Sequence, residues 1–246
     1  MSNKTLPVVL PINRTIKETA RHVTLFFKGV LNFKPGQFVM MWLPGVDEKP
    51  FTLSYHTENE FGITVEEKGK FTKAVSLLKT GEKLGFRGPF GNGFSLDSEI
   101  KNICVIAGGC GMAPLAPFID LCLKHNKKIK IIQGAKTKED LLFRKRFPEI
   151  DYCTDDGTLG YHGLVTEYFD QQKIQFDQVY TCGPEPMMKK VLDICNKKQI
   201  DCQVSLERFM KCGIGICASC VCGSERVCVE GPVFTSEKIK KMNDFG

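Results

Sequence analysis

Five of the twelve cysteines in this chain fall in one short stretch near the C-terminus, Cys212, Cys217, Cys220, Cys222 and Cys228. The first three follow the spacing C-x4-C-x2-C, and Cys228 follows Cys220 after seven intervening residues. This spacing is close to that of the four thiolate ligands of a plant-type [2Fe–2S] cluster. Gly213 and Gly215 suit a loop wrapped around a cluster, because glycine adopts backbone angles that other residues avoid.

A zinc site with four cysteine ligands is the main alternative, and unligated thiols are a second one. Structural zinc sites usually combine two CxxC-type pairs. Here Cys212 stands alone, five residues before the single CxxC formed by Cys217 and Cys220. The spacing therefore favours an iron–sulfur cluster.

Composition sets the broad class. The chain has 246 residues, of which 42% are hydrophobic and 25% charged, as is ordinary for soluble globular proteins. No apolar run approaches the ~20 residues of a membrane span. The N-terminal apolar stretch is too short and too interrupted by proline for a signal peptide. We therefore expect a cytoplasmic protein without membrane association or a disulfide scaffold. The net charge of +6 is mild, and no basic stripe suggests nucleic-acid binding.

The N-terminal part is dominated by β-branched and aromatic runs. Short strands are predicted at 23–27, 37–43, 61–66 and 84–88, with turns at Pro35-Gly36 and Pro44-Gly45 between them. A short helix is predicted at 74–78. Several short strands at regular spacing indicate a small antiparallel β-barrel, which we assign to residues 1–97.

From residue 98 the pattern changes to alternating strands and helices. Strands are predicted at 103–107, 129–133, 151–154, 178–182 and 202–206. Helices are predicted at 114–125, 138–147, 164–172 and 185–199. This alternation predicts an open parallel α/β sheet over residues 98–206. Residues 207–246 then form a small cysteine-containing domain with a short helix near 236–242, so the fold class is α/β plus β.

Three motifs, Gly108–Pro114, Thr154–Gly160 and Cys182–Met187, follow predicted parallel strands, and ligands of such sheets bind at the carboxyl ends of the strands. The first strand ends in Gly108-Gly-Cys-Gly-Met-Ala-Pro114, a glycine turn leading into a helix N-terminus, where an anion is favoured. An ordinary glycine turn is the alternative for this motif, and a core thiol is the alternative for Cys182. The convergence predicts a dinucleotide site, with the Cys182 sulfur beside a reacting nicotinamide. The candidate contacts are Gly109, Gly111, Pro114, Asp155, Gly183 and Pro184.

The barrel contributes a second candidate site. Lys49-Pro-Phe-Thr-Leu-Ser54 places a cation, a rigid turn and two hydroxyls within six residues, which could bind a phosphate and a polar ring edge. The alternative is a strand with an ordinary lysine. Gly69-Lys-Phe-Thr72 opens the predicted helix, and Thr72 could cap it beside an anion.

Together these motifs resemble a known family. The Lys49–Ser54 run, Gly109-x-Gly111-x-x-Pro114 and Cys182-Gly-Pro are similar to the ferredoxin–NADP reductase superfamily. The added cysteine segment, with Cys228-Val-Glu-Gly-Pro-Val-Phe234, closely resembles the electron-transfer subunits of NAD-dependent (class 1B) dihydroorotate dehydrogenases. The resemblance covers nearly the whole chain. It implies FAD in the barrel, NAD at the parallel sheet, [2Fe–2S] in the tail, and a catalytic FMN-containing partner in a heterotetramer with two copies of each subunit.

The resemblance also implies site residues. The flavin contacts would be Lys49, Pro50, Phe51, Thr52, Ser54, Thr64, Val65, Glu66, Phe71 and Thr72. Lys49 stands where the family usually has arginine, and Phe71 where it usually has glycine. Cys222 is an additional thiol. We expect Cys212, Cys217, Cys220 and Cys228 to be the ligands, because Cys222 is only two residues from Cys220.

The function expected from this resemblance is an electron relay in pyrimidine biosynthesis. The chain would pass electrons from a dihydroorotate-oxidising FMN subunit through [2Fe–2S] and FAD to NAD+, and it has no candidate base for dihydroorotate itself. One alternative keeps the cofactors but makes the chain a diaphorase subunit of a hydrogenase or of a ferredoxin-linked oxidoreductase. Another is a zinc-stabilised binding module without redox function.

Overall fold

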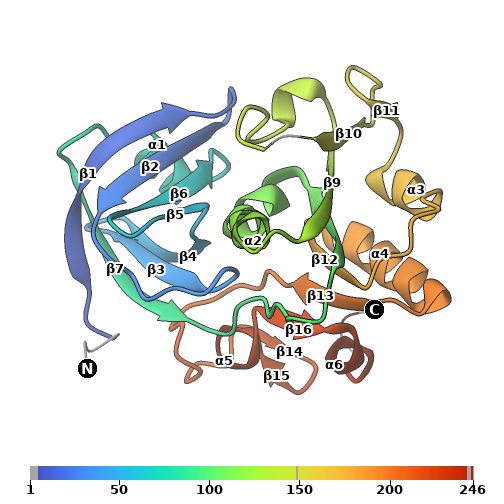
Figure 1. Cartoon of the computed structure of the whole chain (residues 1–246). Helices are drawn as coiled ribbons and strands as arrows, with labels where there is room; N and C mark the ends of the chain where they lie inside the picture. The colour runs from blue at the N-terminus through green and yellow to red at the C-terminus, as the bar shows by residue number, and fades with distance from the viewer. Residues whose placement is uncertain (1–4, 148, 243–244, 246) are drawn as a thin grey trace.

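A computed structural model describes residues 5–147, 149–242 and 245. Within these residues the chain forms two seven-stranded sheets and a two-stranded ribbon, which lie side by side in Figure 1. None of the described helices combines the length and the apolar character that a membrane crossing requires.

The N-terminal sheet is antiparallel throughout, as predicted, with the order β4-β3-β7-β1-β2-β6-β5. Its two end strands are consecutive in sequence, so the sheet curls around its own core (Figure 1). Its strands are β1 (Val8–Lys17), β2 (His22–Lys28), β3 (Phe38–Leu43), β4 (Asp47–Thr52), β5 (Tyr55–His56), β6 (Glu60–Glu66) and β7 (Lys83–Phe90).

Strand β3 connects the N-terminal sheet to the rest of the molecule. Successive side chains of a strand point to opposite faces. Val39 and Met41 accordingly lie in the core of the N-terminal sheet. Phe38 and Met40 instead lie in a second core that includes the cysteine segment. The apolar residues of β3 are therefore buried on both faces.

The predicted helix at 74–78 begins earlier than expected. Helix α1 spans Lys70–Ser76, and Gly69 precedes it as the N-cap residue. Thr72 lies in the first turn, where its hydroxyl accepts hydrogen bonds from the backbone N–H groups of Gly69 (2.9 Å) and Lys68 (3.0 Å). Thr72 thus accepts hydrogen bonds from the backbone before the helix while lying in its first turn. The expectation that Thr72 would be the N-cap residue is wrong, because Gly69 holds that position.

The central sheet contains the five predicted parallel strands and has the order β11-β10-β9-β8-β12-β13-β16. The edge strand β16 comes from the C-terminal segment and pairs antiparallel with β13. The strands are β8 (Asn102–Gly108), β9 (Lys128–Ala135), β10 (Ile150–Thr154), β11 (Tyr161–His162), β12 (Gln178–Cys182), β13 (Asp201–Ser205) and β16 (Val233–Thr235).

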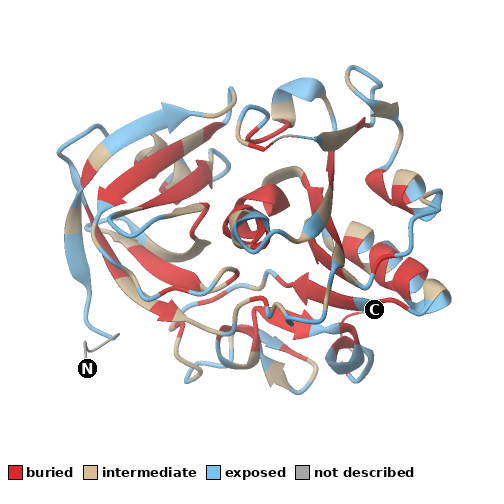
Figure 2. Cartoon of the chain, in the orientation of Figure 1, coloured by how far each residue is buried: buried red, intermediate tan, exposed pale blue. Residues whose placement is uncertain are grey.

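Helices cover both faces of the central sheet. Helix α2 (Met112–Lys124) packs on one face, where the rings of Phe118 and Tyr180 lie 4.1 Å apart. Helices α3 (Val165–Asp170) and α4 (Glu185–Lys198) pack on the other face. Figure 2 shows the resulting pattern, in which the strands between these helices are buried and the loops are exposed.

The predicted helix at 138–147 is wrong. Only a short 3-10 turn, η2 (Lys138–Asp140), forms there. Phe143 has a left-handed backbone with φ of 55°, which ends any helix at that point. Leu142, Phe143 and Phe147 are buried in the core beside α2 as parts of an irregular loop.

The C-terminal segment packs between the two sheets and does not form an isolated unit. Cys220, Cys222 and Cys228 are buried in the same core as Phe38 of β3 and Met188 of α4. This segment has turns and bends up to residue 220, followed by β14 (Val221–Cys222), β15 (Glu225–Arg226), α5 (Val227–Glu230), β16 and α6 (Ser236–Lys240). The cysteines are therefore positioned by contacts with both sheets.

Candidate functional site

The order of the central sheet reverses between β8 and β12, since β9 and β10 continue on one side and β13 on the other. A crevice forms at the carboxyl ends of strands at such a point, and ligands bind there. The loop after β8 closes on the end of β12. A Cβ atom at Gly111 would lie 2.2 Å from the carbonyl oxygen of Cys182, so only glycine permits this approach.

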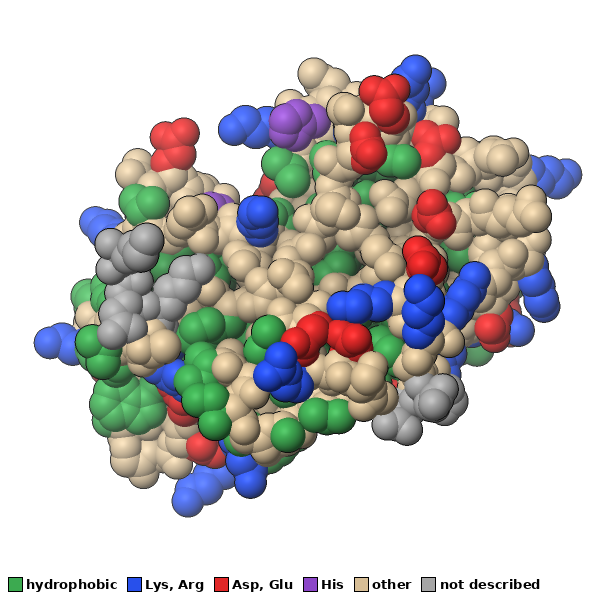
Figure 3. All heavy atoms as spheres, turned by 90° about the horizontal axis from the view of Figure 1, so that it is seen from below, with side chains coloured by type: hydrophobic (Ala, Val, Ile, Leu, Met, Phe, Trp, Pro, Cys, Tyr) green, Lys and Arg blue, Asp and Glu red, His purple; other side chains and the backbone are tan. Residues whose placement is uncertain are grey.

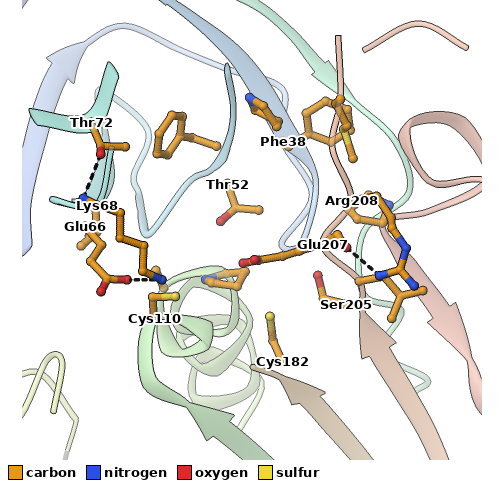
Figure 4. Close-up of a pocket in the computed structure, with 18 of the residues that line it drawn as sticks. Phe38, Thr52, Glu66, Lys68, Thr72, Cys110, Cys182, Ser205, Glu207 and Arg208 are labelled. Carbon is orange, nitrogen blue, oxygen red and sulfur yellow. Dashed lines mark hydrogen bonds and ion pairs between the residues drawn. The ribbon is translucent and has the colours of Figure 1, made fainter. Parts of the chain in front are cut away.

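Two cavities open at this edge. The first, which we call the barrel cavity, has a volume of about 290 Å³ and lies between the N-terminal sheet and the central sheet. Figure 4 shows Thr52 and Thr72 on its N-terminal side, with Cys110, Cys182 and Ser205 on its other side.

The second, which we call the edge cavity, has a volume of about 870 Å³ and follows the carboxyl ends of the parallel strands. Gly109, Asp155 and Gly183 line it. Gly109 has φ of 52°, and a Cβ atom there would meet no atom of the chain within 4 Å. The backbone at Gly109 is therefore open to the cavity, as close binding of a diphosphate requires.

The two cavities are neighbours, because six residues line both of them. These are His22, Glu66, Lys68, Cys110, Glu207 and Arg208. They come from the N-terminal sheet, from the loop after β8 and from the end of β13. Ligands bound in the two cavities would thus be separated by little more than these side chains.

Most of the predicted site residues line one of these cavities. In the barrel cavity they are Pro50, Phe51, Thr52, Thr64, Glu66, Thr72, Pro114 and Cys182. In the edge cavity they are Gly109, Asp155, Gly183, Pro184 and again Glu66. The motifs after three different parallel strands therefore meet at one edge, as the sequence predicted.

Five predicted contacts are not among the lining residues. The ammonium group of Lys49 pairs with Asp47 at 2.6 Å. The hydroxyl of Ser54 is buried and hydrogen-bonded to that of Thr64 at 2.7 Å. The other three are buried: Val65 and Phe71 in the core of the N-terminal sheet, and Gly111 against Cys182. Four of the five are therefore buried behind the lining residues and support them by packing. These are Ser54, Val65, Phe71 and Gly111.

The shared wall carries a compact set of charges. Lys68 Nζ lies 2.8 Å from Glu66 Oε2, and this hydrogen bond raises the pKa of Lys68. His22 Nε2 lies 3.8 Å from the same carboxylate oxygen. Burial lowers the pKa of His22, so its ring is neutral at neutral pH. Arg208 donates to Glu185 Oε2 at 2.8 Å, across the mouth of the edge cavity.

Two thiols face the cavities. Burial raises the pKa of Cys182 well above its usual range, and that of Cys110 to about 11. Both are therefore neutral thiols and contribute no negative charge near a bound ligand. Cys182 lines the barrel cavity at the end of β12, where its neighbour across the sheet is Ser205.

The cysteine segment arranges four thiols in two pairs. The side chains of Cys212 and Cys217 are in hydrogen-bonding contact, and so are those of Cys220 and Cys228. Cys222 belongs to neither pair, and its sulfur accepts a hydrogen bond from Arg208 Nη2 at 3.1 Å.

The chemistry of this donor set suits a two-iron cluster. Two pairs of thiols match a [2Fe–2S] cluster, in which four thiolates are distributed over two irons. Hydrogen bonds involving Ser219 lower the pKa of Cys217 to about 6, which favours the thiolate that ligation requires.

The loop that holds these cysteines is anchored to the N-terminal sheet. Gly213 and Gly215 have φ of 71° and 81°. The carbonyl of Cys212 accepts a hydrogen bond from Arg87 of β7 at 3.1 Å, and Arg87 itself binds Glu48 through two bonds of 2.7 and 2.6 Å. The first predicted ligand is thus attached to the sheet that forms the barrel cavity.

Sequence reasoning missed five of the six residues in the shared wall. Glu207 and Arg208 directly follow β13, so the rule about carboxyl ends would have found them. Cys110 lies inside the glycine turn that was already identified. His22 and Lys68 carry no local signal, because only the pairing of β2 with β6 places His22 opposite Glu66.

Two family models match the chain. The model described as "Iron-sulfur cluster binding domain of dihydroorotate dehydrogenase B" matches residues 207–240. The model described as "Oxidoreductase NAD-binding domain" matches residues 105–193. The first range contains all five clustered cysteines, and the second contains the loops after β8 and β12.

Similar proteins of full length are found in archaea. A protein of Methanocaldococcus jannaschii is 44% identical over 98% of this chain and 94% of its own length. One of Thermoplasma acidophilum is 43% identical over 94% of this chain and 90% of its own. Both are named probable dihydroorotate dehydrogenase B (NAD(+)), electron transfer subunit.

Solved structures show the same architecture. A chain of an NADH-dependent reduced ferredoxin–NADP oxidoreductase superposes with a TM-score of 0.84, at 26% identity, over 94% of this chain and 89% of that chain. The cytochrome b5 reductase domain of Ulva prolifera nitrate reductase superposes with a TM-score of 0.68, at 19% identity, over 80% and 95%. The latter likeness concerns the fold alone.

Proposed function

This chain belongs to the family of dihydroorotate dehydrogenase B (NAD(+)) electron transfer subunits, and from that membership we propose that it relays electrons between NAD(H) and an FMN-containing catalytic subunit. FAD occupies the barrel cavity, NAD(H) occupies the edge cavity, and a [2Fe–2S] cluster is ligated by Cys212, Cys217, Cys220 and Cys228. Two copies of each subunit form a heterotetramer.

One observation carries this proposal: the two cavities share a wall, and the cysteine segment is anchored to the same N-terminal sheet. A relay needs its carriers close together, and this arrangement brings the three candidate sites into one part of the molecule. When bound, FAD supplies the exchange between two-electron hydride chemistry and the single-electron chemistry of an iron–sulfur cluster.

The residues of the chain bind and orient the carriers. The open backbone at Gly109 and the N-terminal end of α2 receive the diphosphate of NAD(H). The neutral Cys182 thiol and the Ser205 hydroxyl pack where the nicotinamide meets the barrel cavity. On the other side, Pro50, Phe51 and Thr52 of β4 hold the flavin. These walls also exclude water from the space between the two ligands.

The visible spectrum of the anaerobically purified protein tests the proposal. We expect flavin absorption bands together with an iron–sulfur shoulder, and bleaching of both when NADH is added. Dihydroorotate added to this subunit alone should change neither, because in the proposed function its oxidation belongs to the FMN-containing partner. A colourless protein that contains zinc would contradict the proposal, and so would oxidation of dihydroorotate by the single subunit.

The partner is expected to dock where the cysteine segment reaches the surface. Cys217 is exposed, and its neighbour Ile216 is 79% exposed. Val221 and Val229, from the same segment, are 44% and 38% exposed. Figure 3 views the molecule from the side of α5, β14 and β15 and shows hydrophobic side chains on this face beside both acidic and basic ones. Apolar residues with a charged rim are typical of protein–protein interfaces.

A further inference from the structure

His22 is a buried side chain with an unused hydrogen-bonding atom at the junction of the two cavities. It is the first residue of β2, it is only 4% exposed, and it lines both cavities. Its Nε2 atom is buried and has no hydrogen-bond partner among the described residues. Buried polar atoms are nearly always hydrogen-bonded, so a lone one beside a cavity indicates a missing ligand.

The other ring nitrogen determines which atom carries the proton. His22 Nδ1 lies 2.7 Å from the hydroxyl oxygen of Thr19. That oxygen accepts a hydrogen bond from the backbone N–H of Arg21 at 3.2 Å. Because the Thr19 oxygen already accepts from Arg21, we assign the hydroxyl hydrogen of Thr19 to Nδ1 and the proton of the neutral ring to Nε2.

No side chain in the described part of the chain takes this proton. The closest carboxylate oxygen, Glu66 Oε2, is 3.8 Å away, which is too long for a hydrogen bond. Glu66 is already bound to Lys68 at 2.8 Å. Burial lowers the pKa of His22, and the charged groups around it are Glu66, Arg21, Asp140 and Lys68. The ring is thus a neutral donor that faces the cavities.

We propose that His22 is a further cofactor-binding residue, which donates its Nε2–H to an oxygen or nitrogen acceptor of bound FAD. The inference rests on the proposed function, because that function places FAD in the barrel cavity. FAD is favoured over NAD because His22 begins β2 of the N-terminal sheet and Thr19 lies in the turn that leads into it. In addition, His22 pairs with Glu66 of β6, and both residues line the barrel cavity.

Nitrogen NMR of the histidine rings tests the contact directly. The chain has four histidines, and His22 is the one that lines a described cavity. In the full chain labelled with 15N-histidine, the His22 ring should show a protonated Nε2 and an unprotonated Nδ1. Adding FAD to flavin-depleted protein should shift the Nε2 signal and leave the other three rings unchanged. NAD+ alone should leave His22 unchanged.

Substitutions test the energetic contribution. His22→Phe removes the donor but keeps a ring, and it should raise the dissociation constant of FAD by about tenfold, the effect of one lost hydrogen bond. His22→Gln can present an amide N–H near the position of Nε2, and it should restore most of that affinity. His56→Phe is the matched control, because His56 lies in the same sheet, outside both cavities, and bonds to Leu31 O.

The outcomes separate the two proposals. If FAD binds but His22→Phe binds it as tightly as wild type, or if FAD leaves the His22 signals unchanged, the inference is overturned and the proposed function stands. A shift caused by NAD+ alone would also overturn it. If the wild-type chain binds no FAD, the proposed function fails first and the inference fails with it. Circular dichroism of each variant shows whether the fold is retained.

Discussion

Two buried cysteines of the C-terminal segment, Cys222 and Cys228, differ in what their sulfur atoms contact. Cys228 pairs with Cys220, whereas Cys222 accepts a hydrogen bond from Arg208. The sequence spacing already favours Cys228 as the ligand, because Cys222 is only two residues from Cys220. The structure adds that Cys222 lies in the β14–β15 ribbon, whereas Cys228 lies in α5.

Serine substitutions of these two cysteines give opposite expected results. Cys228→Ser should abolish or strongly reduce the iron–sulfur absorption and the bound iron, because a cluster ligand is lost. Cys222→Ser should retain both, since a hydroxyl can still accept the bond from Arg208. Iron analysis and the visible spectrum of the two purified variants check this. Cluster loss in Cys222→Ser with retention in Cys228→Ser would reverse the ligand assignment.

Single residues also mark the limit of motif reasoning. The run 49–54 was expected to contact a flavin as a unit. Pro50, Phe51 and Thr52 line the barrel cavity, but Lys49 instead pairs with Asp47, and Ser54 bonds to Thr64 inside the sheet. Conversely, His22 lay in no motif, because its place opposite Glu66 depends on a pairing between strands that are far apart in sequence.

At the scale of elements, the loop from Cys212 to Cys217 depends on left-handed glycines. A Cβ atom at Gly213, where φ is 71°, would lie 2.8 Å from Met40 Cγ of β3. Gly213→Ala should therefore lower the free energy of unfolding by about 2 kcal/mol, from backbone strain plus the clash. Gly45→Ala is the control, since Gly45 has a similar φ of 77° and open space around it.

Thermal or chemical unfolding of both variants measures this difference. Gly45→Ala should lose only the cost of the backbone conformation, about 1 kcal/mol. Gly213→Ala should lose more and should also bind less iron, because Cys212 would be displaced from its bond with Arg87. Equal losses in the two variants would show that the contact with Met40 does not restrain the loop.

The irregular segment that replaces the predicted helix at 138–147 connects the two halves of the molecule. Arg146 donates to the carbonyl of Ser54 at 2.6 Å and to Asp120 of α2 at 2.5 Å, and its guanidinium lies 3.7 Å from the centre of the Tyr55 ring. A local sequence pattern carries no information about such contacts between distant parts of the chain, so the helix was predicted wrongly. The segment is held by these long-range contacts and by the left-handed Phe143.

Arg146→Ala should lower the free energy of unfolding by about 2 kcal/mol, since it removes one ion pair and a hydrogen bond to a half-buried carbonyl. It should also weaken FAD binding, because the barrel cavity lies between the two halves that Arg146 joins. Arg144→Ala, two residues away and exposed, is the matched control and should change neither quantity. Urea unfolding and flavin fluorescence measure the two effects. If the two variants unfold and bind FAD alike, Arg146 does not hold the two halves of the molecule together.

At the scale of the whole molecule, the sequence predicted both sheets, because antiparallel and parallel strands leave different hydrophobic patterns. It also predicted that three motifs meet at one edge, since the carboxyl ends of parallel strands share an edge. It did not predict that the C-terminal segment would add β16 to the central sheet. β16 has only three residues, and so short an edge strand shows no recognisable hydrophobic pattern in the sequence.

This embedding of the C-terminal segment determines which surface a partner can use. Cys220 and Cys228 are buried whereas Cys217 is exposed, so a partner reaches the cysteines through the exposed residues near Cys217. Ile216→Asp should weaken association with the catalytic subunit, because it would place a charge in the apolar centre of the interface. The dissociation constant should rise tenfold or more, which corresponds to a loss of about 1.4 kcal/mol of binding free energy. NADH oxidation with a small-molecule acceptor should remain unchanged, since both cavities lie elsewhere.

Val30→Asp provides the control. Val30 is 77% exposed, almost the same as the 79% of Ile216, but it follows β2 in the N-terminal sheet. Association measured by calorimetry or by co-purification should therefore be retained in Val30→Asp and lost in Ile216→Asp. If both variants associate normally, the partner must approach another face, and electrons would have to leave the cluster through the buried side of the segment, where Cys220 and Cys228 pack against the core.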